Sequence, residues 1–169
     1  MNEVEMNKQA KLSPHFTVGE LTKTSYHTSD GNIPSHVAIE NLKRICGWLE
    51  ILRERYNRKY GGRREGVRRE GDEEDADIPV IISSGYRSEE VNLKCGGAKG
   101  SNHLTGCAVD IKCLGLEQMI RYACLLLDTA DENRWVFDEL IQEKRGTTYW
   151  IHFAVRPKDN RRKILFDCR

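Results

Sequence analysis

The stretch "VFDELIQEKRGTTYWIHFAV", residues 136–155, holds two runs of apolar and polar residues on either side of a turn. Each run, 136–143 and 149–155, is long enough for a strand, and "KRGTT" between them supplies the glycine that suits a tight turn. The stretch therefore predicts a β-hairpin. Because strand side chains alternate between two faces, the hairpin also decides which residues share a sheet face.

Further strands are expected on both sides of this hairpin. "KILFDC", 163–168, follows the turn-rich "RPKDNRR" and predicts a last strand. "GCAVDIKC", 106–113, alternates well enough for another. "IPVIISSGYRS", 78–88, is a β-branched run that ends in a glycine turn, so we expect a buried strand that delivers Arg87 to one end of the sheet.

Helices are expected in the early and middle parts of the chain. Thr17 and Glu20 have the spacing of a capping box and predict a short helix. Apolar residues recur every three to five positions over 34–60, which predicts a longer helix with Pro34 in its first turn. "SEEVNLK", 88–94, predicts a brief helix, and 114–130 a second amphipathic one.

This order of elements predicts an α+β fold, a central antiparallel sheet flanked by helices in one domain that spans residues 1–169. "GGRREGVRREGDEED", from Gly61, combines glycines with charge blocks of both signs. Such a composition is typical of a solvated segment of little fixed structure. We expect a flexible charged insertion at 61–76 within the domain.

Charge and hydropathy exclude several classes of partner. The chain has 27 basic and 26 acidic residues, and its mean hydropathy is −0.63. The near-zero net charge gives no overall electrostatic attraction for nucleic acid, and no apolar run approaches the roughly 18 residues of a membrane span. "MNEVEMNKQAKLS" lacks the apolar core of a signal peptide, so we expect a protein that is cytoplasmic as synthesised.

The six cysteines are expected to be free thiols. They are scattered, they form no C-x-x-C pair, and there is no secretory signal to support a disulfide framework. This scatter does not favour a cysteine-based zinc site, and small buried hydrophobic residues are the preferred interpretation. The cysteines are Cys46, Cys95, Cys107, Cys113, Cys124 and Cys168.

A different metal site is suggested by "SNHLTGCAVDIK", residues 101–112. Its loop and strand can aim His103 and Asp110 at one point, and Gly106 permits close backbone approach. Catalytic zinc sites use three protein ligands, and His152 in "YWIHF" is the natural third, because burying a histidine in an apolar strand is costly without a partner. Taken singly, each residue has an ordinary structural interpretation.

In order and spacing, "SGYRS", "VN", "GG", "SNHLTGCAVDIK" and "WIHF" resemble the zinc D-alanyl-D-alanine carboxypeptidase family of peptidoglycan metallopeptidases, of peptidase M15 type. The family includes bacterial carboxypeptidases, the D,D-dipeptidases of vancomycin resistance and phage endolysins. The resemblance runs from near His15 to about Val155 and includes the specific pattern S-x-H-x-x-G-x-A-x-D. It implies a hedgehog/D,D-peptidase-like fold.

The resemblance also implies roles for individual residues. The family's Zn²⁺ ligands fall on His103, Asp110 and His152. The motif arginine falls on Arg87, whose guanidinium could hold a carbonyl or a developing oxyanion. The family serine falls on Ser101, where its hydroxyl would help to hold the substrate.

The general base is not decided by the resemblance. Several branches have an acid three residues before the last histidine ligand, and here that position is Tyr149. The endolysin-like branch that this chain is most similar to has F-D-x-L-I-x-E before its W-x-H strand, and "FDELIQE" matches it. Glu143 is the favoured base, with Glu139 and Asp138 as rivals.

Together these features imply a zinc peptidase that hydrolyses amide bonds in peptidoglycan stem peptides beside a D-amino acid, with carboxypeptidase or endopeptidase action. We expect a monomer that reaches the wall by lysis or holin-type release. Two alternatives stay open. The first is a catalytically inactive zinc-bearing cell-wall or protein-binding module, with which Tyr149 is compatible. The second is a metal-free interaction domain.

Overall fold

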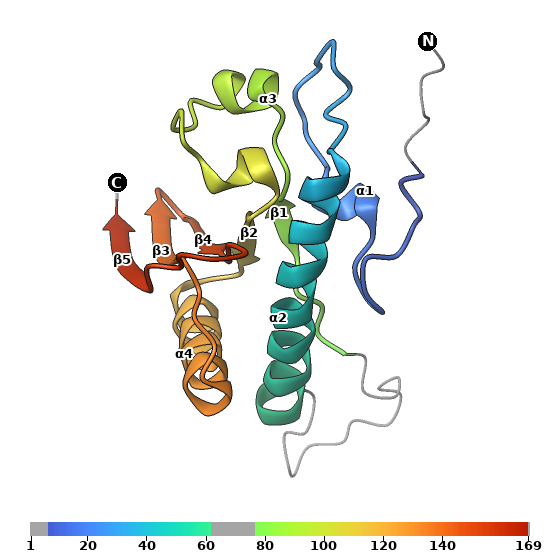
Figure 1. Ribbon diagram of the computed structural model, residues 1–169. Coiled ribbons are helices and arrows are strands. Elements are labelled where there is room, and N and C mark those ends of the chain that lie inside the picture. The colour runs from blue at the N-terminus through green and yellow to red at the C-terminus, as the bar shows by residue number, and fades with distance from the viewer. Residues whose placement is uncertain (1–6, 62–76, 169) are drawn as a thin grey trace, which may run out of the picture.

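The computed structural model describes residues 7–61 and 77–168, in which one five-stranded sheet is flanked by helices (Figure 1). The helices are α1 (Val18–Leu21), α2 (His36–Tyr60), α3 (Glu89–Lys94), the 3₁₀ helix η1 (Asn102–Thr105) and α4 (Leu116–Asn133). The strands are β1 (Ile82–Ser84), β2 (Ala108–Cys113), β3 (Glu139–Arg145), β4 (Thr148–Ala154) and β5 (Lys163–Cys168). The expected α+β class, with a sheet flanked by helices, is confirmed.

The strand order is β1-β2-β4-β3-β5, and the expected hairpin forms its centre. Its turn consists of Gly146 and Thr147, and Gly146 has a φ of 58°, a left-handed conformation that glycine adopts without strain. One pairing differs from the antiparallel sheet that we expected. β4 ends beside the start of β3, and residues 155–162 cross past that end of β3, so β5 starts there and runs parallel to β3.

Cross-strand register brings residues from four strands into one row. Asp110 of β2 lies opposite His152 of β4, which lies opposite Ile141 of β3, which in turn lies opposite Leu165 of β5. Residues two positions along a strand share a face. The sheet therefore presents the side chains around His152 together on one side.

The apolar core lies on the opposite face of the sheet, beneath α2 and α4. Leu140 and Phe153 are fully buried there, and Trp48 of α2 stacks edge-on against Phe153 with ring centroids 5.3 Å apart. Burying one such side chain stabilises a fold by roughly 1.5–3 kcal/mol. In Figure 1, α4 lies on one side of the sheet, and α3 and η1 lie on the other.

Two boundaries differ from the sequence-based expectation. Ser35 is the N-cap of α2, because its side chain accepts a hydrogen bond from the Ala38 N–H, so Pro34 precedes the helix. β1 is shorter than 78–88. Beyond Ser84 the backbone turns away from the sheet, and the Tyr86 N–H donates to the Leu21 carbonyl instead of to a strand.

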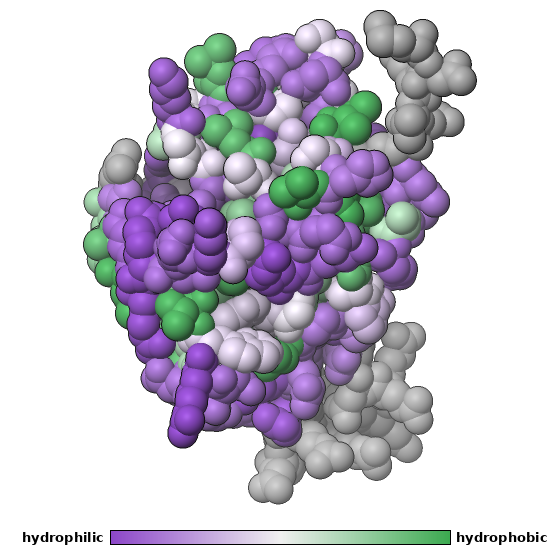
Figure 2. All heavy atoms as spheres, in the orientation of Figure 1, coloured by the Kyte–Doolittle hydropathy of each residue, from purple (hydrophilic) through white to green (hydrophobic). Residues whose placement is uncertain are grey.

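The surface drawn in Figure 2 is mostly hydrophilic, with apolar side chains in small separate groups. None of the helices within the described ranges combines the length and the apolar character needed to cross a bilayer. The expected insertion at 61–76 lies outside the described residues apart from Gly61, which follows α2.

The cysteines are free, but only half of them are buried, which corrects the expectation of small buried hydrophobic residues. Cys46, Cys107 and Cys113 are buried, whereas Cys95, Cys124 and Cys168 are exposed. Cys124 lies on the side of α4 that faces away from the core, so the apolar neighbours in its sequence do not cover it.

Thiol titration tests this division. In the native protein we expect three thiols to react quickly, and all six to react after unfolding. Burial raises the pKa of Cys46 and of Cys113 to about 12, which suppresses the reactive thiolate in the folded state. Fewer than six reactive thiols in denaturant would reveal disulfides and contradict the structure.

Candidate metal centre

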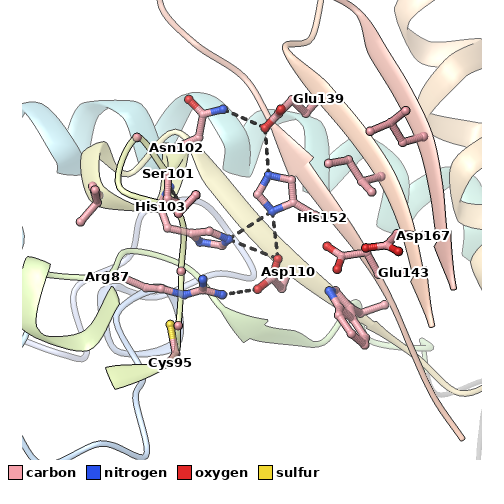
Figure 3. Close-up of a pocket in the computed structure, with 18 of the residues that line it drawn as sticks. Arg87, Cys95, Ser101, Asn102, His103, Asp110, Glu139, Glu143, His152 and Asp167 are labelled. Carbon is pink, nitrogen blue, oxygen red and sulfur yellow. Dashed lines mark hydrogen bonds and ion pairs between the residues drawn. The ribbon is translucent and has the colours of Figure 1, made fainter. Parts of the chain in front are cut away.

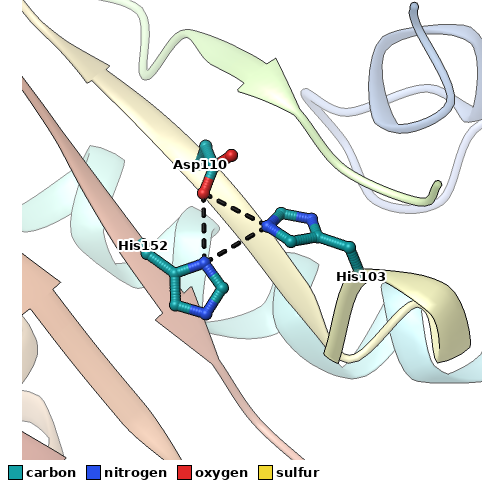
Figure 4. Close-up of side chains that lie close together, drawn as sticks. All are labelled: His103, Asp110 and His152. Atoms are coloured by element: carbon teal, nitrogen blue, oxygen red, sulfur yellow. Dashed lines mark hydrogen bonds and ion pairs between the residues drawn. The ribbon is translucent and has the colours of Figure 1, made fainter. Parts of the chain in front are cut away.

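His103, Asp110 and His152 converge on one point from three different elements (Figure 4). His103 Nε2 lies 3.2 Å from Asp110 Oδ1 and 3.2 Å from His152 Nδ1, and His152 Nδ1 lies 3.1 Å from Asp110 Oδ1. The three ligand atoms thus form a nearly equilateral triangle. All three residues are buried, with exposed fractions of 2%, 8% and 9%.

Partners outside the triangle determine which atoms carry hydrogen. His103 Nδ1 lies 2.6 Å from the carbonyl oxygen of Gly85, so it must donate, and His103 Nε2 is left with a lone pair. His152 Nε2 lies 3.3 Å from Glu139 Oε2, and donation there leaves the lone pair of the neutral ring on Nδ1, where either a proton or a metal ion can bind. Three electron-rich atoms therefore face one another, and the arrangement favours a cation between them.

The donor set fits zinc. Ligand atoms about 2.0–2.1 Å from a tetrahedral zinc ion are separated by roughly 3.3 Å, close to the sides of the triangle. Burial favours the neutral carboxyl of Asp110, yet the two histidines outweigh it and lower the pKa of Asp110. Burial also opposes a charged His152, but Asp110 and Glu139 raise the pKa of His152 to about 9. The lowered pKa of Asp110 and the raised pKa of His152 both mean that the site favours positive charge.

Local structure explains how His103 reaches the triangle. Ser101 is the N-cap of η1, and its hydroxyl accepts a hydrogen bond from the His103 N–H. Gly106 ends η1 with a φ of 70°, and a Cβ there would lie 2.5 Å from the Ala38 carbonyl oxygen. Glycine is therefore required at this approach between η1 and α2, as the sequence suggested.

Arg87 lies beside the triangle, where it contacts Asp110. Its Nη2 donates to Asp110 Oδ2, the carboxylate oxygen directed away from the two histidines, and its Nε donates to Ser84 Oγ at 2.8 Å. The Arg87 N–H also bonds the His103 carbonyl oxygen at 3.1 Å. Arg87 thus orients a member of the triangle. Its expected contact with an oxyanion stays a prediction, as does the substrate contact of Ser101.

The three candidate bases, Asp138, Glu139 and Glu143, occupy different environments. Glu139 and Glu143 line the pocket that contains the triangle, on the same sheet face as His152. Asp138 is fully buried and does not line the pocket; Arg161 Nη2 donates to it at 2.7 Å and Asn102 Nδ2 at 2.8 Å, and both of these side chains also contact Glu139. Arg161 and Asn102 hold the pKa of Asp138 at about 2 against the effect of burial.

Glu139 and Glu143 differ in their hydrogen bonds and in their pKa. The hydrogen bond from His152 lowers the pKa of Glu139 to about 2. Burial, and next the negative charge of Asp110, raise the pKa of Glu143 above its ordinary value. The Trp150 indole N–H donates to Glu143, and Figure 3 shows the Glu143 carboxylate beside that of Asp167. Of the two, Glu143 is therefore the stronger proton acceptor.

The pocket around the triangle has a volume of about 1190 Å³ and is walled by η1 and residues 95–101 on one side and by β3 and β5 on the other (Figure 3). The sequence did not single out Gly85, Asn102, Trp150 or Asp167, which contribute to this site. Alternation along the strands could have found Trp150, two residues before His152. No sequence signal identifies the Gly85 carbonyl, because its role depends on the backbone alone.

The buried charge of Asp138 generates a stability prediction. Asp138→Asn should lower the free energy of unfolding by about 1–3 kcal/mol at pH 7, the scale of a hydrogen bond to a charged group. Because the folded pKa is depressed, this contribution is present above about pH 4 and is lost as the pH falls towards 2. Urea unfolding at several pH values measures it. Asp131→Asn is the control, because its exposed pair with Arg162 should contribute little.

The comparisons with known proteins agree with this geometry. A family model described as Peptidase M15 matches residues 70–137, which contain Arg87, Ser101, His103 and Asp110 but precede Glu143 and His152. A search of curated proteins found no match. The matched stretch is similar to the peptidase M15 family, and the converging His103, Asp110 and His152 agree with that similarity.

Proposed function

We propose that this protein is a zinc-dependent peptidase that hydrolyses amide bonds in peptidoglycan stem peptides, beside a D-amino acid. The observation that carries the proposal is the buried triangle of three lone pairs at His103, Asp110 and His152. The match of residues 70–137 to the Peptidase M15 model supports a peptidase, and the resemblance to D-alanyl-D-alanine carboxypeptidases is the reason for the cell-wall substrate. The charged groove beside the triangle is large enough for several residues of a peptide.

In the proposed reaction, Glu143 acts as the general base. A zinc ion held by the triangle would supply Lewis acidity and a water whose pKa is lowered towards about 7. Glu143 takes a proton from the attacking water and returns it to the nitrogen of the leaving amine. Its raised pKa suits both transfers, because a carboxylate that is too acidic holds a proton poorly.

Two neighbours act as positioning residues in this scheme. Glu139 holds the His152 ring in the tautomer that leaves Nδ1 free, and Arg87 holds the outer oxygen of Asp110. The N–H groups of Arg87 that Asp110 and Ser84 do not use are proposed to stabilise the oxyanion. Ser101 is proposed to contact the substrate. We further propose that the protein acts as a monomer after lysis or holin-type release.

Metal analysis tests the triangle. Protein prepared without chelator should carry about one zinc ion per chain, and adding zinc to the chelated protein should raise its melting temperature. Alanine at His103, Asp110 or His152 should remove most of the metal affinity and leave a folded domain, because the apolar core lies on the other sheet face. The proposal fails if no metal binds and zinc gives no stabilisation.

Substitution of the acids tests the base. Glu143→Gln should keep zinc and lose roughly 10²–10⁴-fold in kcat on purified muropeptides, the scale of a positioned acid–base group. Glu139→Gln should instead weaken zinc binding about 10–100-fold, since it acts through His152. Asp138→Asn should weaken zinc binding less than Glu139→Gln and keep most of kcat, because Asp138 does not line the pocket and is linked to Glu139 only through Asn102 and Arg161.

The pattern across these variants separates the alternatives. Full activity in Glu143→Gln with a collapse in one of the other two would move the base to that residue. Zinc binding by the wild-type protein with no turnover of any muropeptide would identify a catalytically inactive zinc-bearing module instead.

A further inference from the structure

A second pocket, of about 470 Å³, lies where α2 meets the end of α4 and the start of the loop after β4. Its floor is apolar. Trp48 and Trp135 meet edge-on with ring centroids 5.2 Å apart, and Val136 and Val155 extend the surface. Trp135 is 42% exposed and Val136 is 49% exposed. Aromatic side chains that stay open to solvent in a concave pocket suit a binding site.

Arginines surround this apolar floor. Arg44, Arg134 and Arg156 line the pocket, and no acidic side chain lines it. Across residues 7–61 and 77–168, no carboxylate oxygen lies within 4.0 Å of Arg44 or Arg134. Arg156 lies 3.7 Å from Asp138, whose charge is already shared with Arg161. The rim therefore carries uncompensated positive charge, which favours an anionic ligand.

The pocket adjoins the groove of the metal centre at the end of the sheet where β4 ends. Arg156 lines both cavities. Arg44 Nη1 donates to Asn41 Oδ1 at 2.7 Å, and Asn41 Nδ2 donates to the carbonyl oxygen of Thr105 at 2.9 Å. Thr105 belongs to η1, the turn that carries His103, and lines the groove. Arg156 is therefore the residue through which a ligand in the groove would reach the tryptophan side.

We propose that this tryptophan–arginine pocket is a subsite that binds a carboxylate-bearing, partly apolar segment of the same extended substrate. The inference rests on the proposed peptidase function and adds a specificity element to it. Guanidinium groups bind carboxylates through paired hydrogen bonds, and the tryptophan floor can pack against the apolar part of the segment. Charge complementarity selects an acidic ligand over a neutral or basic one of the same size.

The test compares a soluble muropeptide with free carboxylates and the same muropeptide with its carboxyl groups amidated. Affinity is measured by titration calorimetry with zinc-loaded full-length Glu143→Gln protein, so that turnover does not consume the probe. Arg134→Gln, added to this background, should weaken binding of the carboxylate probe on the order of tenfold, the scale of one charge-assisted hydrogen bond. Amidation should weaken binding similarly, and Arg134→Gln should then add nothing.

Two further variants make the experiment specific. Trp135→Ala should weaken both probes, since it removes the apolar floor, and Arg58→Gln, exposed on α2 outside both pockets, should change neither. In the active protein, Arg134→Gln should raise KM for the carboxylate probe and leave kcat unchanged.

Equal affinity of the parent and Arg134→Gln proteins for the carboxylate probe would overturn the subsite, as would a loss that persists unchanged with the amidated probe. Failure of the proposed peptidase would be seen separately, as absence of turnover by the wild-type protein. The calorimetric comparison decides the subsite in that case too, because it does not depend on catalysis.

Discussion

The surrounding structure satisfies one constraint: the ligand atoms of three buried side chains must point their lone pairs at the same position. His103, Asp110 and His152 lie about 3 Å from one another at their ligand atoms, and each is held there by a hydrogen bond from outside the triangle. Without those outer bonds the rings could turn and the histidine protons could relocate. The Gly85 carbonyl, Glu139 and Arg87 therefore matter as much to the site as the ligand atoms do.

The sheet allows this site and a packed core to coexist, because its two faces serve different purposes. Leu140 and Phe153 point into the core, whereas their neighbours Glu139 and His152 point into the groove. The hairpin is thus apolar on one side and ionisable on the other. Loss of the metal ligands should consequently leave most of the burial energy of the fold intact.

Charges of both signs line the groove at each end. Glu143, Asp167 and Arg145 lie near the hairpin turn, while Arg156 and Arg161 lie near the loop after β4, where Arg161 also contacts Glu139. The proposed subsite would add the arginines of the tryptophan–arginine pocket to this second end.

The sequence alone determined the elements whose signals are local. The hairpin, the capping box at Thr17 and the helix cap at Ser88 follow from residue spacing and hydrogen-bonding groups a few positions apart. The motif around His103 and Asp110, with His152 in its apolar strand, likewise indicated which side chains would be brought together. These predictions rest on short sequence patterns, whose local hydrogen bonds and side-chain spacing do not depend on distant segments.

Only the tertiary structure decided the features that depend on distant segments. The parallel pairing of β5 follows from the path of residues 155–162, which no local pattern specifies. Asp138 and Glu139 are adjacent in sequence, and Asn102 and Arg161 contact both carboxylates, yet only Glu139 reaches His152 while Asp138 is fully buried. The Gly85 carbonyl is invisible in the sequence, since every residue has one, and only folding brings this one to His103.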